Sequence, residues 1–588
     1  MRKHFGTLLS IIFVVVIFTG WFASAQPLKN TRVEDFGLHD HQGNFHTLYY
    51  YSDASAIVLF IQGNGCPISR NAVLALNKVR VDYEPKGVVF LMLNANLQDR
   101  RADIAVEADA FNIDYPILVD ETQLVAESLD LQRTGEAIVI HPATWKIIYR
   151  GPVDDRLNYE TQRANAKHTY LADALSAHLR GEEIVVSVIS SPGCIIALPN
   201  KDTVQHEQIS YARDIAPILQ NRCQNCHKEG GIGPWAMTSY DDVRGWAPMI
   251  REVIRTRRMP PWHADPHVGK FSNDFSLTIE ETQTVVHWIE ADAPRGEGSD
   301  PLEEIPTLAR TWTMGEPDLV VDLGTQKLPA TGLIDYLYID KELSLDHDVW
   351  VRAVEILPGN LAVVHHILAS VIYPEAFTSP IETEERWLDG IFAAYVPGIE
   401  TETFPEGTGR ILPAGSKLRF QVHYTVTGRP ETDTTKFGIY FSDKPAEKEF
   451  LIVGPANSEI EIPPGAKAYQ ASTERVFNQE VTLYGMFPHM HFRGKSMSYE
   501  AHYPDGSTEM LLSVPNYNFN WQRFYTFGRG KVLPAGTKIV CRATFDNSSQ
   551  NPFNPDPTKT IHWGEQSFDE MLIGYMSLTY GTLGQRSE

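Results

Sequence analysis

The spacing of apolar residues changes twice along this chain of 588 residues. Within residues 26–190, short apolar runs alternate with segments of helical spacing, and one such helical segment follows Cys66 and Pro67. Alternating strands and helices of this kind predict an α/β domain. The strand-like runs are Ala56–Gln62, Val88–Leu93 and Ala137–Ile140.

Residues 205–297 carry apolar residues at helical spacing, which predicts an all-α domain. The expected helices are Ile209–Gln220, Asp241–Arg258 and Ile279–Ala291. An apolar stripe on the second helix, which includes Met249, is expected to face the core. The Ser/Pro/Gly-rich stretch that begins at Ser190 predicts a linker between the first two domains.

From about residue 305, strand-like segments alternate with Pro/Gly turns, which is typical of antiparallel sandwiches. The turn Pro-Ala-Gly occurs in both halves of this region, ending at Gly415 and at Gly536. We therefore expect two all-β domains, at residues 305–445 and 446–588. The predicted fold class is multidomain, with an α/β domain, an all-α domain and two β domains in that order.

The N-terminus has the features of a secretory signal at residues 1–25. A basic start is followed by the apolar run Leu8–Phe22 and by the small residues Ala23-Ser24-Ala25. An uncleaved membrane anchor is the alternative, although the run is shorter than the ~20 residues of a comfortable span. We expect a periplasmic or secreted protein, free of the membrane after signal cleavage.

The net charge of −23 limits the class of partner. Lys and Arg supply most of the affinity for nucleic acid and for anionic membranes, so neither is an expected partner. An acidic surface says nothing about the fold.

The sequence Cys223-Gln-Asn-Cys226-His227 has the spacing of a c-type haem attachment site. Two thiols would bond the haem, and His227 would ligate the iron. Met259 is the expected sixth ligand, because two prolines follow it and fix its loop. The rivals are Met237 and Met249, and a redox or zinc cysteine pair is the alternative reading. The segment resembles a cytochrome c domain.

Four groups of residues in the β region offer metal ligands. His489 and His491 are two apart, so a strand would place both on one face. Met571 offers a thioether, which favours copper over zinc or magnesium. His423 lies on a strand expected at residues 417–426. His365 and His366 are adjacent, so they can share one metal only if the strand twists or they use different ring nitrogens.

The order of these groups resembles the copper type II, ascorbate-dependent monooxygenases, represented by peptidylglycine α-hydroxylating monooxygenase and dopamine β-monooxygenase. The resemblance covers residues 310–588. It rests on Val364-His365-His366, Gln421-Val-His423-Tyr, His489-Met-His491 and Asp569-Glu-Met571.

This resemblance implies two jelly-roll domains with one copper ion each. It also implies insertion of one oxygen atom from O2 into a C–H bond. An electron-storage copper is implied at His365, His366 and His423. An oxygen-activating copper is implied at His489, His491 and Met571, with Tyr575 nearby.

Two positions depart from the peptide-processing members of that group. Phe487 and Ile573 stand where those enzymes place an Arg and an Asn that hold a substrate carboxylate. An apolar side chain cannot pair with a carboxylate. We therefore expect a small organic substrate in an apolar pocket. Cys541 is expected to be a small buried core residue.

Residues 33–180 resemble the redoxin branch of thioredoxin-like proteins, on Asn64-Gly-Cys66-Pro and Arg133-Thr134-Gly135. Cys66 is expected at a strand-to-helix turn, where a helix N-terminus lowers the pKa of a thiol. There is no C-x-x-C sequence, and no proline follows Thr134. Cys194 could resolve a Cys66 sulfenic acid, or the two could form a plain structural disulfide.

These observations predict an exported copper-dependent monooxygenase whose two copper ions receive electrons through a haem c. The upstream electron donor is unknown. One alternative is a non-catalytic electron-transfer protein that carries copper and haem, although a carrier does not need two separated copper sites. The other is a thiol peroxidase in which Cys66 is catalytic.

Overall fold

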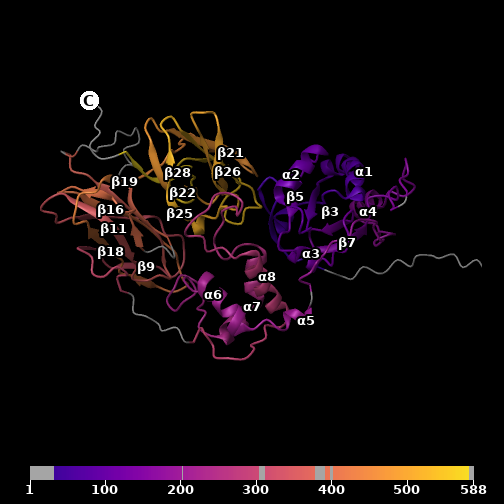
Figure 1. The fold of residues 1–588 in the computed structure, drawn as a ribbon, viewed down its shortest axis with the longest axis horizontal. Coiled ribbons are helices and arrows are strands. Elements are labelled where there is room, and N and C mark those ends of the chain that lie inside the picture. Colours follow the sequence, from indigo (N-terminus) through magenta and orange to yellow (C-terminus); the bar gives the residue numbers. More distant parts are fainter. Residues whose placement is uncertain are drawn as a thin grey trace, which may run out of the picture.

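The computed structural model describes residues 32–159, 161–201, 203–303, 311–375, 377, 391–396 and 401–581. An α/β region lies at one end of an elongated molecule, the β regions lie at the other end, and the helical region touches both (Figure 1). The predicted signal at residues 1–25 is outside the described residues. Among the helices that are described, none combines the length and the apolar character that a membrane span needs.

The α/β region is built on a five-stranded sheet of order β5-β4-β3-β6-β7. Strands β3, β4 and β5 are parallel, β6 runs antiparallel to β3, and β7 runs antiparallel to β6. Alternate residues of β3 enter two separate apolar cores, so both faces of the sheet are covered and the strand is apolar throughout. The three strand predictions are confirmed.

The strands of this region are β1 (Gly37–His39), β2 (Phe45–Thr47), β3 (Ala56–Gln62), β4 (Val88–Asn94), β5 (Ile117–Val119), β6 (Ala137–His141) and β7 (Lys146–Gly151). Its α-helices are α1 (Pro67–Tyr83), α2 (Arg101–Ala110), α3 (Leu124–Ser128) and α4 (Tyr170–Leu179).

The predicted linker after Ser190 is not a free connection. Val188 forms a bridge with Arg150, and Ile195 forms a bridge with Arg133. The side chain of Ile196 is buried in the core of the α/β region. The chain therefore stays packed on this region beyond residue 190, where the domain was expected to end.

The helical region comprises α5 (Thr203–His206), a π-helical turn η3 (Tyr211–Ile215), α6 (Ala216–Arg222), α7 (Tyr240–Arg255) and α8 (Ile279–Glu290). One expectation is wrong here. Met249 was predicted to lie in the core, but 44% of its surface is exposed. It lines a cavity beside Cys223 and Cys226 instead. Helical spacing finds an apolar stripe but does not show which part of it faces a cavity.

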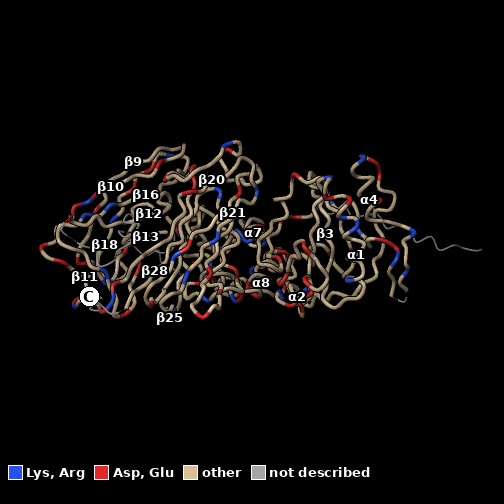
Figure 2. The backbone as a smooth tube through the Cα atoms, turned by 90° about the horizontal axis from the view of Figure 1, so that it is seen from above, with Lys and Arg blue, Asp and Glu red and all other residues tan. Residues whose placement is uncertain are grey.

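The described β regions hold two four-stranded sheets, the two-stranded sheets β17-β9 and β20-β27, and one nine-stranded sheet that both regions share. The shared sheet has the order β25-β22-β28-β19-β15-β11-β18-β8, with β14 paired to β11. Its two halves join where β15 and β19 pair in parallel. The two sandwiches are therefore continuous through one sheet. Acidic and basic residues are interspersed along the described part of the chain (Figure 2).

The first β region contains β8 (Leu319–Asp322), β9 (Gln326–Leu328), β10 (Leu337–Glu342), β11 (Val349–Leu357), β12 (Val364–Ile372), β13 (Ile391–Tyr395), β14 (Thr401–Thr403), β15 (Thr408–Leu412), β16 (Lys417–Tyr424), β17 (Glu431–Asp433) and β18 (Lys436–Phe441). The second contains β19 (Lys448–Val453), β20 (Glu461–Ile462), β21 (Tyr469–Val476), β22 (Val481–His489), β23 (Gly494–His502), β24 (Thr508–Val514), the short helix η4 (Phe519–Trp521), β25 (Tyr525–Leu533), β26 (Lys538–Phe545), β27 (Ile561–His562) and β28 (Ile573–Tyr580).

Candidate functional site

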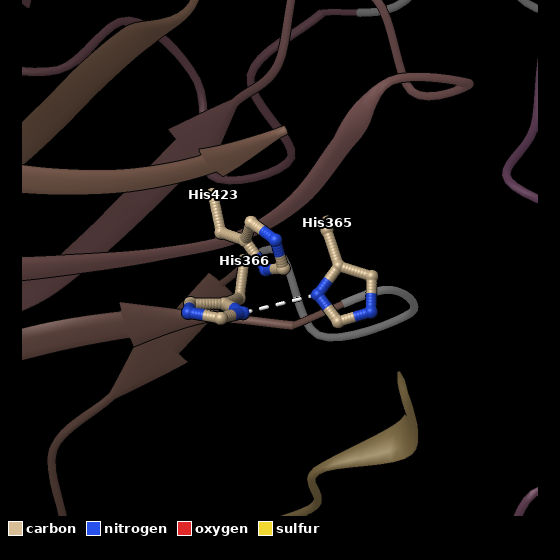
Figure 3. A group of neighbouring side chains, drawn as sticks. All are labelled: His365, His366 and His423. Carbon is tan, nitrogen blue, oxygen red and sulfur yellow. Dashed lines mark hydrogen bonds between the residues drawn. The ribbon is translucent and has the colours of Figure 1, made fainter. Parts of the chain in front are cut away.

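A β-bulge brings the three histidines of the first β region together. Strand β12 pairs with β16, and the register shifts between Val364 and His366, so that His365 is the extra residue. His366 lies opposite His423 across the two strands. A bulge interrupts the alternation of side chains, so adjacent histidines can face one side. All three side chains converge in Figure 3.

The geometry of this cluster fits one metal ion. A ligand nitrogen from each histidine can be chosen so that all lie within 4.8 Å of one another. The Nδ1 atoms of His365 and His366 are 3.0 Å apart. Two nitrogens that each bind one metal at about 2.0–2.1 Å lie at roughly this separation. Nδ1 of His423 and Nε2 of His365 have no hydrogen-bond partner of normal geometry.

Burial keeps these imidazoles neutral. It lowers the pKa of His365 to about 4 and the pKa of His423 to about 3. The pKa of His366 also falls well below its ordinary value, because of burial and then the neighbouring histidines. Neutral imidazole is the form that binds metals. The three side chains are thus ready to act as ligands at neutral pH.

The second histidine pair lies at the end of β22. His489 is the last residue of the strand, and His491 follows it in a loop, with their rings 5.3 Å apart. Nδ1 of His489 is 2.7 Å from Oε1 of Gln522. His491 is 1% exposed, and neither of its ring nitrogens has a partner of normal geometry. Imidazole nitrogens of this kind suit copper as well as zinc, iron and nickel.

Glu570 ties Met571 to this pair. Its carboxylate, which is fully buried, accepts the backbone N–H groups of His491, Arg493 and Met571. The loop that carries the thioether is therefore fixed against the loop that carries His491. Glu570 was part of a motif in the sequence but was not singled out there, because its role depends on contacts distant in the chain.

An apolar wall lies beside His489. Phe487 stacks on Phe524, with ring centroids 4.5 Å apart, and also lies 5.8 Å from the ring of Tyr575. The ring of Tyr575 is 6.0 Å from His489. Ile573, the other residue expected in this pocket, is fully buried. Phe487, Ile573 and Tyr575 are all buried in the apolar core of the first β region, and none of the three carries a positive charge that could pair with a carboxylate.

The predicted haem attachment sequence lines a cavity of about 360 Å³. Cys223, Cys226, His227 and Met259 all contribute to its wall, together with Met237 and Met249. Nδ1 of His227 is 3.0 Å from the carbonyl oxygen of Trp235. This hydrogen bond places the proton on Nδ1 and leaves Nε2 for a metal. The thiols, the histidine and the mainly apolar cavity fit a haem c.

The α/β region contains a separate pair of thiols. Cys66 precedes α1 and is buried, and its Sγ is 2.8 Å from Sγ of Cys194, with no disulfide between them. The hydroxyl of Thr134 donates to the Cys66 sulfur at 3.1 Å. Burial raises the pKa of the Cys66 thiol, but the hydrogen bonds from Cys194 and Thr134 outweigh it and lower the pKa. Burial and the contact with Cys66 raise the pKa of Cys194 to about 11.

The comparisons with known proteins concern this α/β region. Residues 30–156 match the AhpC/TSA family. They form a redoxin domain of the thioredoxin-like class, as the sequence predicted. The predicted cytochrome c and copper monooxygenase modules stay predictions. Cys541 is fully buried, as expected.

Three solved structures resemble part of the chain. A hypothetical protein from Sinorhizobium meliloti 1021 is 26% identical, with 28% of this chain and 92% of that chain covered and a TM-score of 0.25. Peroxidoxin BcpB from Mycobacterium tuberculosis is 18% identical, with 26% and 96% covered and a TM-score of 0.21. A thiol:disulfide interchange protein of the thioredoxin family from Chlorobium tepidum TLS is 12% identical, with 26% and 99% covered and a TM-score of 0.21.

Proposed function

We propose that this chain is an exported copper-dependent monooxygenase that inserts one oxygen atom from O2 into a C–H bond of a small organic substrate. The observation that carries the proposal is the bulge at His365. It turns two adjacent histidines and His423 into one largely buried set of neutral nitrogen donors. A strand with regular alternation would not bring them together.

Copper bound at such sites would supply one-electron redox chemistry and a place for O2 to react. The three-histidine cluster would hold one ion. His489, His491 and Met571 would hold the other. Phe487 and Tyr575 would position an apolar substrate beside His489 and keep water away from it. Glu570 would hold the loops of the second set in register.

The helical region would supply the electrons. Cys223 and Cys226 would bond the haem, and His227 would present Nε2 to the iron because Trp235 holds its other nitrogen. Met259 is the proposed sixth ligand, from a loop that also reaches the cavity. A thioether ligand raises the haem potential, which suits a relay.

The test compares Met571→Ala with Met510→Ala, a control on β24 that is 40% exposed. Copper-loaded protein with intact haem is reduced with ascorbate and given isotopically labelled O2 and ethylbenzene. This probe has a benzylic C–H bond and matches the aromatic wall. We expect labelled alcohol from the wild type and from the control, and none from Met571→Ala. Equal product from all three proteins would contradict the proposal.

A second activity is favoured by the contact between Cys66 and Cys194. The Cys66 thiolate would attack hydrogen peroxide and break its O–O bond, which gives a sulfenic acid and, after protonation, water. The Cys194 thiol would then attack that sulfur, form a disulfide and release a second water. An external dithiol would have to reduce the disulfide for the next cycle.

This activity is tested by peroxide consumption in the presence of dithiothreitol. Cys66→Ala should abolish it and leave copper binding unchanged. With dithiothreitol left out, Cys194→Ser should still consume about one equivalent in a single turnover, because only the resolving thiol is lost. Peroxide consumption by Cys66→Ala at the wild-type rate would exclude this activity.

A further inference from the structure

One short segment, Phe519–Arg523, lies where the three predicted metal centres meet. It consists of η4, Gln522 and Arg523, and only Phe524 separates it from β25. We call it the connecting segment. Its sequence alone does not indicate a functional role, because it has neither periodic spacing nor a residue of a common metal-ligand type.

Phe519 separates the two predicted copper sites. Its ring centroid is 6.0 Å from that of His365, 5.9 Å from that of His423 and 5.7 Å from that of His491. The side chain is 3% exposed. A single buried aromatic ring therefore lies beside predicted ligands of both sites.

Gln522 links the connecting segment to His489. Its side chain is 5% exposed, and Oε1 is 2.7 Å from Nδ1 of His489. Oε1 can only accept, so Nδ1 carries the proton and Nε2 is left for the metal. The amide thus fixes both the tautomer and the orientation of this imidazole.

The residues on either side of Gln522 belong to the haem cavity. Trp521 and Arg523 line it together with Cys223 and Cys226. Arg523 is 4% exposed, and its guanidinium lies over the ring of Phe275, 4.8 Å from the ring centroid. One stretch of backbone therefore forms the cavity wall and holds a predicted copper ligand.

Hydrogen bonds hold the helical region against the residues that follow the connecting segment. The amide of Asn273 donates to the carbonyl of Phe524 at 2.8 Å and accepts from the backbone N–H of Thr526 at 3.1 Å. Trp262 packs against Tyr525, with ring centroids 4.8 Å apart, and is part of the apolar core of the second β region. The haem cavity is therefore built against the second β region and needs no docking motion to approach it.

We propose that the connecting segment is the path by which electrons pass from the haem to the copper held by His489, His491 and Met571, with Gln522 as a positioning residue. The inference rests on the proposed function and deepens it. In this step a ferrous haem loses one electron and a cupric ion gains it, with no bond broken and no proton moved. Electrons reach the His489 site first and cross Phe519 to the three-histidine site.

The experiment measures haem reoxidation without oxygen. Protein loaded with haem and cupric ion receives a photochemical pulse that reduces the haem, and the decay of the ferrous absorbance is followed. Gln522→Leu keeps the volume but cannot accept a hydrogen bond from His489. We expect it to slow the decay at least about tenfold, as losses of such supporting contacts do. Gln522→Glu keeps the acceptor oxygen and should restore the rate.

Gln421→Leu is the matched control. Gln421 lies on the strand of His423 but donates to the hydroxyl of Tyr338 at 2.8 Å rather than to a histidine. It should leave the decay unchanged. His366→Ala disrupts the three-histidine copper site. Because the electron is proposed to reach the copper at His489 first, this variant should also keep the fast decay. A slow decay in His366→Ala would overturn the proposed order.

The outcomes distinguish failure of the proposed function from failure of the proposed electron path alone. If the wild type binds both metals but copper does not speed haem reoxidation, the proposed function fails. If the wild type transfers the electron and Gln522→Leu transfers it at the same rate with equal copper content, only the inference fails. Trp521→Leu serves as a second variant if Gln522→Leu loses its copper. An unchanged rate in Trp521→Leu would also overturn the path.

Discussion

Replacing Gly193 by alanine should separate the two thiols of the α/β region. A Cβ atom at this position would lie 1.8 Å from the carbonyl oxygen of Thr134 and 2.7 Å from its carbonyl carbon. Both are backbone atoms, and the N–H of Thr134 donates to the carbonyl of Cys194 at 2.9 Å. The loop of Thr134 cannot give way without breaking that bond. The chain around Gly193 must therefore withdraw.

The size of the effect follows from the contacts that would be lost. Thr134 N bonds Cys194 O at 2.9 Å, Cys194 N bonds Thr134 Oγ1 at 3.1 Å, and Ile196 N bonds Gln132 O at 3.0 Å. Each such bond contributes about 1 kcal/mol, so docking weakens by about 3 kcal/mol. Since 1.4 kcal/mol corresponds to a factor of ten, the equilibrium constant for docking falls about 100-fold. Disulfide formation between Cys66 and Cys194 should slow by a similar factor.

The assay uses one equivalent of hydrogen peroxide, followed by alkylation of the remaining thiols and mass spectrometry. Dimedone trapping reports in parallel whether Cys66 still forms a sulfenic acid, which it should. Gly245→Ala is the control, because nothing lies within 4 Å of the added Cβ. Disulfide formation at the wild-type rate in Gly193→Ala would refute the reasoning, since it would mean that the docked backbone does not hold Cys194 in place.

Three further predictions concern the proposed metal sites and acid stability. His366→Ala should lower the bound copper by about one ion per chain, because the two histidines that remain, His365 and His423, form a weaker chelate than three. Elemental analysis showing an unchanged copper content would exclude this site. Glu570→Ala should cost about 3 kcal/mol or more of unfolding free energy, since it leaves buried N–H groups of His491, Arg493 and Met571 unsatisfied. Urea denaturation measures this cost, and equal midpoints for the variant and the wild type would contradict it. Burial and then Arg523 lower the pKa of His263 to about 4, below its ordinary value of 6.5. Stability from its neutral form is therefore present above pH 6.5 and is lost as the pH falls towards 4, by about 3 kcal/mol, so His263→Gln should show a smaller loss than the wild type over that range.

The sequence predicted most reliably the features that depend on local pattern. The apolar run Ala56–Gln62 is buried on both faces of a sheet, so its composition alone marks it as a strand. The helix at Ile279–Glu290 begins with a capping box in which Thr278 and Glu281 bond each other's backbone. Signals of this kind act within a few residues, so no partner from elsewhere in the chain is needed to read them.

The parts that could not be predicted depend on partners distant in the sequence. The bulge at His365 arises only from pairing with the strand of His423, and adjacent histidines by themselves indicate opposite faces. Gln522 became recognisable only when the fold brought it to His489. The sequence did contain one indication that the backbone around Cys194 packs closely against Thr134, namely the glycine at position 193. Composition alone, however, does not distinguish a flexible glycine from one that allows close backbone contact.

The sheet shared by the two β regions determines how the chain can be divided. Phe450 and Ile452 lie on β19, yet both belong to the apolar core of the first region, as do Phe487 and Tyr575. Expression of residues up to 445 alone would remove those side chains from the core and leave β15 with an uncovered edge. An exposed edge strand promotes aggregation. A proteolytic cut in the turn between β18 and β19 would instead leave two fragments that stay associated, so the proposed copper sites are expected to survive nicking but not truncation.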